Sequence, residues 1–235
     1  MIHNYDDFIR ELHAAGFSQF GLGKSNVATV FLHSWNEQPE DSPVRWFSGD
    51  PDRDPWEWRA RVVNERDDIA YAKFFLRRAG FITREWYPYF LAVRRKGRDF
   101  AEAYADGLYS RAALHIHECL EQNGALPVHD LKPMAGFGRT GLGPGDKAAF
   151  ERGLADLQMG LYITVCGHAQ KVSRVGEPYG WSSDVYCCTA EEFMPEEAEA
   201  AALLEPAEAA EAIEAQVYRL NPEAEAKAVR KFIYG

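Results

Sequence analysis

A run of cations beside aromatic residues is the feature of this chain that is best suited to chemistry. The run follows the aromatic segment Trp86 to Phe90 and contains four positive side chains: Arg94, Arg95, Lys96 and Arg98. Such side chains neutralise phosphates, and aromatic rings among them can stack on bases. A charged, solvated helix end would have the same composition. The pattern therefore predicts either a phosphate-contacting surface or a plain helix terminus.

A second set of polar and basic residues falls on a predicted β-hairpin. Residues 161–166 alternate in hydrophobicity as a strand does, and residues 183–188 return as its partner. Four residues between these strands are candidates for DNA contact: His168, Gln170, Lys171 and Arg174. Because the whole chain carries a net charge of −10, DNA binding requires its cations to gather. We therefore predict that the cations of both sets share one face: Arg94, Arg95, Lys96, Arg98, Lys171 and Arg174.

Glu57, between Trp56 and Trp58, is the carboxylate best placed for acid–base chemistry. In apolar surroundings such a group can act as a general acid or base. Glu57 also stands three residues after Asp54, where a capping box places its carboxylate at the start of a helix. We favour the capping role.

Three histidines are candidate metal ligands: His115, His117 and, further along the chain, His129. Residues two apart on a helix point to nearly opposite faces, so His115 and His117 cannot share one ion. We predict one core and one surface histidine, and no metal or cofactor. The four cysteines lack C-x-x-C spacing and are predicted to be small buried residues in a reducing compartment: Cys119, Cys166, Cys187 and Cys188.

Charge is unevenly distributed along the 235 residues. Residues 45–98 carry 13 Lys and Arg against 8 Asp and Glu, whereas residues 191–235 carry 4 against 11. No apolar run approaches the ~20 residues that span a bilayer, and the N-terminus lacks the pattern of a signal peptide. We therefore expect a cytoplasmic protein with no membrane partner.

Hydrophobic periods place these residues on secondary-structure elements. Residues 69–76 alternate as a strand does, while their length and alanine content also permit a helix. We favour a strand that pairs with Phe81-Ile82 across a turn. From Ser110 the chain reads as a helix, a short strand, two further helices and the hairpin, which is the winged-helix order. One apolar stripe is expected on the helix after Thr83: Trp86, Tyr89, Phe90 and Val93. We predict that most of the aromatic cluster is core: Trp56, Trp58, Phe74, Phe75, Trp86, Tyr89 and Phe90.

Four segments of the chain resemble a known family: Ala70-Tyr71-Ala72-Lys73-Phe74-Phe75, Phe81-Ile82-Thr83, Trp86-Tyr87-Pro88-Tyr89-Phe90 and Arg94-Arg95. They are similar to a central segment of the AlkZ-like winged-helix DNA glycosylases, most of all to the shorter AlkZ-related members, over about Trp46 to Phe193. The resemblance implies a DNA-facing scaffold in the response to base damage. The Gln-x-Gln or Gln-x-Asp motif associated with the family, whose side chains position the attacking water, has no counterpart here. We therefore predict no excision of alkylated purines.

The expected fold is α+β and mainly helical. A winged-helix domain at residues 104–194 packs on an N-terminal α+β subdomain at residues 1–103, and an acidic helical C-terminal extension follows at residues 195–235. The expected function is duplex DNA binding by a protein related to alkylation-repair glycosylases, without an assigned catalytic residue. Two alternatives stay open: a DNA glycosylase with displaced catalytic residues, and a protein- or ligand-binding winged helix with no DNA role. The oligomeric state stays open too.

Overall fold

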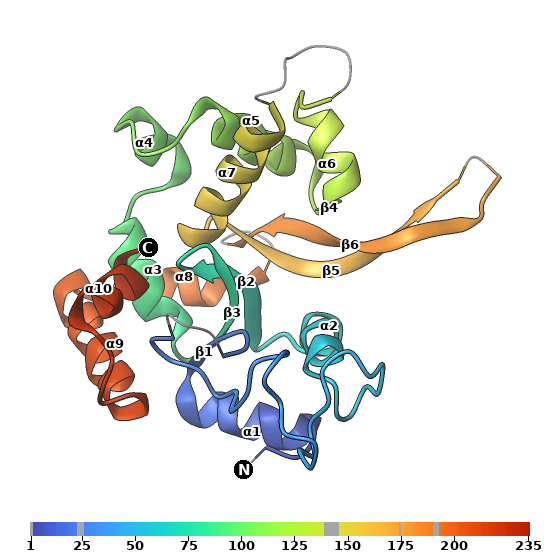
Figure 1. Cartoon of the computed structure of the whole chain (residues 1–235). Coiled ribbons are helices and arrows are strands. Elements are labelled where there is room, and N and C mark those ends of the chain that lie inside the picture. Colours follow the sequence, from blue (N-terminus) through green and yellow to red (C-terminus); the bar gives the residue numbers. More distant parts are fainter. Residues whose placement is uncertain (1, 23–25, 139–145, 174, 190–192) are drawn as a thin grey trace.

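The computed structural model describes residues 2–22, 26–138, 146–173, 175–189 and 193–235 (Figure 1). Within these residues one antiparallel sheet, in the order β1-β3-β2-β5-β6-β4, forms the centre of the molecule. Helices surround the sheet, so the predicted α+β class is confirmed. The strands are β1 (Phe17–Gln19), β2 (Ile69–Phe75), β3 (Arg78–Thr83), β4 (Leu126–Pro127), β5 (Ile163–Val172) and β6 (Pro178–Cys188).

The helices of the described residues fall into three groups along the chain. Two precede the central hairpin: α1 (Tyr5–Ala15) and α2 (Pro55–Glu65). Five lie between the two hairpins: α3 (Tyr87–Arg95), α4 (Phe100–Ala105), α5 (Arg111–Asn123), α6 (Val128–Met134) and α7 (Asp146–Met159). Three follow the last strand: α8 (Pro195–Ala201), α9 (Pro206–Leu220) and α10 (Ala226–Tyr234).

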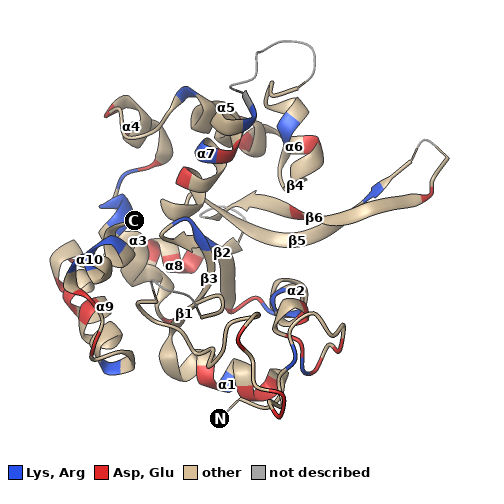
Figure 2. Ribbon diagram, in the orientation of Figure 1, with Lys and Arg blue, Asp and Glu red and all other residues tan. Residues whose placement is uncertain are grey.

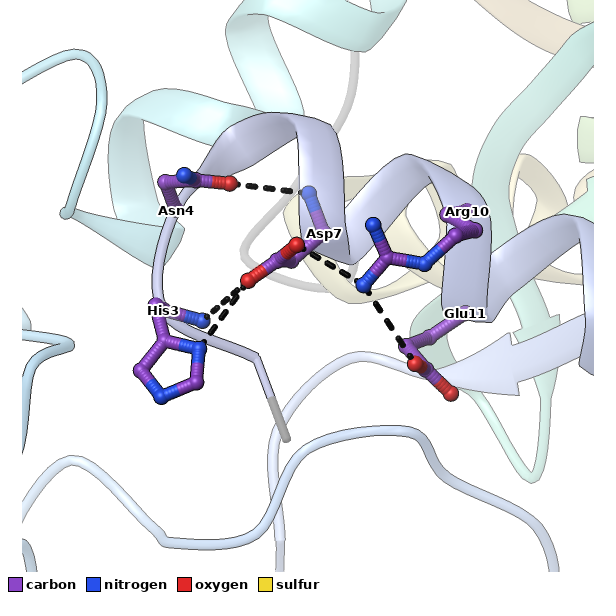
Figure 3. A network of polar contacts seen from close by, with 5 residues as sticks. All are labelled: His3, Asn4, Asp7, Arg10 and Glu11. Atoms are coloured by element: carbon purple, nitrogen blue, oxygen red, sulfur yellow. Dashed lines mark hydrogen bonds and ion pairs between the residues drawn. The ribbon is translucent and has the colours of Figure 1, made fainter.

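The first helix begins in a compact polar network (Figure 3). Asn4 caps α1 by accepting a hydrogen bond from the main-chain N–H of Asp7 at 2.9 Å. The Asp7 carboxylate accepts hydrogen bonds from Arg10 Nη2 at 2.7 Å and from the main-chain N–H of His3 at 3.0 Å. These bonds, that of Arg10 first, lower the pKa of Asp7 to about 2. The helix ends at Gly16, whose φ of 84° is a left-handed conformation that glycine readily adopts.

The hairpin of β2 and β3 lies in the middle of the core, and its predicted pairing is confirmed. Leu76 and Arg77 connect the strands with φ values of 54° and 61°, as in a type I′ turn. A Cβ at Gly80 would lie 2.5 Å from the Phe75 ring and 2.7 Å from the carbonyl oxygen of Ser18. The close approach of three strands therefore requires glycine at this position.

Most of the aromatic cluster is core, as predicted. Four of its rings are fully buried: Trp58, Phe74, Phe75 and Phe90. Trp86 and Tyr89 are half-buried, so the stripe on α3 is less complete than predicted. Trp56 is the exception, because 38% of it is exposed at the start of α2.

The C-terminal helices enclose α3. All three pack against it, and Phe232 of α10 stacks on Phe75 with ring centroids 4.1 Å apart. The side chains of Ile213 and Val217 on α9 are fully buried. Residues 195–235 are therefore part of the folded body, where an acidic extension was expected from the sequence.

The two halves of the chain share the sheet. Tyr71 of β2 pairs with Val165 of β5, which joins the N-terminal strands to the second hairpin. The domain boundary expected at residues 103 and 104 falls between elements that this sheet connects. His117 of α5 is buried and stacks on Phe100 with centroids 4.1 Å apart, as predicted for the core histidine.

Three of the cysteines are buried, and Cys166 is half-buried. Across the described parts of the chain, no helix has the length and apolar character needed to cross a membrane. The same residues contain no group of three or more His, Cys, Asp or Glu arranged to hold a metal ion.

Candidate nucleic-acid interface

Arg94, in the last turn of α3, points into the molecule. Its guanidinium donates hydrogen bonds to four main-chain carbonyls, those of Ile233 at 2.9 Å, Phe74 at 2.8 Å, Met159 at 2.8 Å and Phe232 at 2.7 Å. Burial lowers the pKa of Arg94 to about 9, which leaves the group charged at neutral pH. Because its donors are taken up by carbonyls, Arg94 joins α3 to β2, α7 and α10 rather than facing a phosphate.

Of the other three cations in this run, two contact groups of the protein and one is exposed. Arg95 donates to the carbonyl of Leu161 and lies 4.2 Å from the centroid of the Tyr162 ring. Arg98 Nη1 lies 3.3 Å from Asp106 Oδ2. Lys96 caps α3 in the left-handed conformation, with φ of 53°, and is the exposed member of the four.

The candidate DNA-contacting residues on the hairpin differ from one another in their surroundings. Gln170 Nε2 donates to the carbonyls of Tyr179 at 2.9 Å and Gly180 at 2.7 Å, so its amide bridges the two strands. Lys171 is half-exposed near the outer end of β5. Arg174 lies outside the described residues.

The structure does not bring the cations at the end of α3 and Lys171 together. In the view of Figure 2, α3 and the outer end of the β5–β6 hairpin lie on opposite sides of the molecule. The acidic helices α8 and α9 also pack beside α3. The surface around α3 therefore carries both signs of charge.

A charged cluster forms instead where the hairpin meets α2. Asp184 Oδ1 lies 3.4 Å from His168 Nε2 and 3.9 Å from Arg59 Nη1. The Tyr186 hydroxyl donates to Asp184 Oδ2 at 3.5 Å. Burial acts to raise the pKa of Asp184, but His168 and the positive charges of Arg59 and Lys73 outweigh it and hold that pKa below its usual value. Asp184 is therefore a partly buried carboxylate that is ionised at neutral pH.

Sequence reasoning missed Asp184 and Arg59. Asp184 lies opposite His168 because β5 continues past the predicted strand of residues 161–166 and its register shifts between Val165 and Gly167, so the predicted pairing gave no signal for this contact. Arg59 had no signal either, since the approach of α2 to β5 joins segments about a hundred residues apart. Its role follows only from the packed structure.

The outer half of the hairpin projects from the body (Figure 1). It carries four exposed apolar side chains. The exposed fractions are 90% for Trp181, 83% for Val175, 59% for Val172 and 55% for Tyr179. Contiguous exposed apolar groups in a soluble protein commonly mark an interaction site. The exposed apolar side chains of the hairpin are thus available to a partner.

The chain matches a known family over nearly its whole length. The model of a family described as AlkZ related matches residues 2–234. The chain belongs to the AlkZ-related family. The resemblance seen around β2, β3 and α3 is thereby confirmed, and the AlkZ-related match supports a function connected with DNA repair. No curated protein and no solved structure matches this AlkZ-related chain.

Proposed function

We propose that this AlkZ-related protein binds duplex DNA through a winged-helix unit whose wing is the β5–β6 hairpin. The element order supports the unit, since α5, β4, α6, α7, β5 and β6 follow one another as helix, strand, two helices and hairpin. Pairing supports it as well, because Leu126 of β4 lies opposite Tyr186 of β6. Winged-helix proteins use such units to place a helix or a wing against a DNA groove.

The hairpin, rather than α7, is the contacting element in this proposal. Helix α7 is committed to the core: Phe150 and Leu157 are buried, and Gln158 Oε1 accepts a hydrogen bond from the main-chain N–H of Lys73 at 2.9 Å. Its outer surface has mixed charge, with Lys147 Nζ 3.8 Å from Glu151 Oε1. A groove-reading helix would instead present free cations and amides to the bases.

The single observation that carries the proposal is Trp181, which is 90% exposed on a projecting strand. A large apolar side chain in this position can wedge between base steps, as minor-groove proteins do. Lys171, across the hairpin from Tyr179, supplies a cation for a phosphate. The proposal leaves out Arg94 and Arg95 because their guanidinium groups bind main-chain carbonyls.

Fluorescence anisotropy with a labelled duplex tests this function. Trp181→Ala is expected to weaken binding by roughly 1 to 3 kcal/mol through the loss of a stacked ring. Lys171→Ala is expected to reduce the salt dependence of binding by about one phosphate contact.

Two matched variants control for general effects. Leu203→Ala removes an apolar side chain that is 88% exposed outside the hairpin, and Lys96→Ala removes a cation at the end of α3. Both should bind duplex as the wild type does. Absence of duplex binding by the wild type, or loss with Lys96→Ala but not with the hairpin variants, would contradict the proposal.

A second candidate, a DNA glycosylase with displaced catalytic residues, is favoured by the cluster around Asp184. An ionised, partly buried carboxylate can stabilise the positive charge that develops at a sugar when a glycosidic bond breaks. Release of free base from alkylated duplex DNA, lost in Asp184→Asn and kept in Glu57→Gln, would establish this activity. No release by the wild type would remove the candidate.

A further inference from the structure

We propose that three exposed aromatic side chains, Trp35, Phe47 and Trp56, form a stacking surface for unpaired nucleobases. We call them the aromatic row. The inference rests on the proposed function for its ligand class, nucleic acid. It concerns a different surface and a different form of that ligand, single-stranded rather than duplex.

The row is continuous and faces solvent. The exposed fractions are 62% for Trp35, 58% for Phe47 and 38% for Trp56. Ring centroids are 6.2 Å apart between Trp35 and Phe47 and 5.3 Å apart between Phe47 and Trp56. Three adjoining aromatic rings that stay in water are a large apolar exposure, and such exposure commonly marks an interaction site.

One buried carboxylate holds the row in place. Asp54 is fully buried, and its oxygens accept hydrogen bonds from the main-chain N–H groups of Phe47, Gly49 and Trp56, each at 2.9 Å. Phe47 has a φ of 59°, a left-handed conformation that a bulky side chain rarely adopts. Backbone strain of this kind persists only where surrounding bonds fix it. Asp54 therefore keeps an aromatic ring turned outward.

The row leads to the charged cluster at the hairpin. The Arg59 guanidinium lies 3.8 Å from the centroid of the Trp56 ring and 3.9 Å from Asp184 Oδ1. The Arg59 guanidinium stacks on the indole ring and places a positive charge beside the row. A single strand whose bases stack on the row would therefore have the positive charge of Arg59 next to Trp56.

The inner edge of the row adjoins a cavity of about 430 Å³. Trp46, whose ring centroid is 6.2 Å from that of Phe47, lines this cavity together with Phe31 and Leu32. Polar groups of His33, Gln38, Asp41 and Ser42 also line it. Mainly apolar walls with a few polar groups suit a planar heteroaromatic ring. The cavity can thus accept one base while the row stacks its neighbours.

Single-strand binding assays test the inference at low salt, with a labelled oligonucleotide of about ten nucleotides. The intact chain is expected to bind the oligonucleotide with quenching of tryptophan fluorescence. An abasic oligonucleotide of equal length, which keeps the phosphates, should bind much more weakly. Trp35→Ala, Phe47→Ala and Trp56→Ala should each weaken binding roughly 5- to 100-fold. Trp56→Phe should keep most of the affinity, because it keeps a ring.

Matched controls distinguish a loss of single-strand binding from unfolding of the protein and from a loss of duplex binding. Tyr234→Ala removes an aromatic side chain that is 49% exposed on α10 and should change nothing. Thermal melts of the row variants should stay close to that of the wild type. Trp181→Ala should weaken duplex binding while leaving single-strand binding intact.

Any of three outcomes would overturn the inference. The wild type does not bind the single strand, the abasic oligonucleotide binds equally well, or the row variants bind as the wild type does. Self-association lost in Phe47→Ala, without oligonucleotide binding, would assign the row to a second copy of the chain. If the chain binds duplex but not the single strand, the inference fails and the proposed function stands. If it binds the single strand but not duplex, only the proposed function fails.

Discussion

His168 Nε2 lies 3.4 Å from Asp184 Oδ1, directly across the ladder between β5 and β6. The pair sits where the hairpin leaves the body, and Arg59 of α2 approaches the same carboxylate oxygen at 3.9 Å. Asp184 therefore links the two strands of the hairpin to each other and to α2.

Asp184→Asn tests the link through the pH dependence of stability. The pKa of Asp184 is held below its usual value, so the ionised carboxylate stabilises the fold at neutral pH, and this contribution is lost as the pH falls through the folded-state pKa. The variant should be less stable than the wild type at pH 7, and the difference should shrink in acid. Denaturant unfolding between pH 7 and acid measures both. A difference that does not change with pH, or the same effect in the exposed Asp41→Asn, would contradict this account.

Arg94→Met tests the buried guanidinium. The variant leaves four carbonyl acceptors without their donor, and we expect a loss of roughly 3 to 5 kcal/mol in the free energy of unfolding. Arg94→Lys should recover little, because an ammonium group cannot reproduce the fork of donors. Lys96→Met, at an exposed position two residues further on and just beyond the end of α3, should change stability by less than about 0.5 kcal/mol. Similar losses in the Met variants of Arg94 and Lys96 would show that Arg94 is not a structural anchor.

Gly80→Ala tests the close approach of β1, β2 and β3. The added methyl group would meet the Phe75 ring at 2.5 Å and the Ser18 carbonyl oxygen at 2.7 Å. Relieving this overlap should cost about 1 to 3 kcal/mol. Gly138→Ala is the matched control, since no atom lies within 4 Å of the added Cβ. Thermal melts that rank the two variants equally would show that the sheet can expand at this point.

Phe75→Ala tests the attachment of the C-terminal helix. The Phe75 ring is fully buried and lies 4.1 Å from that of Phe232, so its removal leaves a cavity between β2 and α10. We expect a loss of roughly 3 to 5 kcal/mol, against less than about 0.5 kcal/mol for the exposed Phe47→Ala. Hydrogen exchange should show faster opening of α10 in the Phe75 variant. Unchanged protection of α10 would mean that other contacts hold this helix.

The features of this fold that could be predicted are those whose interacting residues lie close together in the sequence. The pairing of β2 with β3, the capping of α2 by Asp54 and the order of elements after Ser110 were all predictable. Each depends on hydrophobic periods, turns and caps that operate within a few residues of one another. The same local signals predicted that Trp58, Phe75 and other aromatic residues are core.

The direction of the long cationic side chains was decided only by the tertiary structure. Arg94 and Lys96 stand two residues apart in one basic run, yet Arg94 binds the carbonyl of Ile233, 139 residues further along, while Lys96 is exposed. A run of charge does not reveal which of its members will find internal carbonyls, because those acceptors come from distant segments.

By itself, the sequence determined the family, the α+β elements and most of the aromatic core of this protein. Only packing decided that α8 to α10 cover α3, that Arg59 meets Asp184, and that Trp56 stays exposed beside buried Trp58. The physical reason is that periodicity determines which side of an element is apolar, whereas the neighbour of each polar side depends on contacts between segments far apart in the chain.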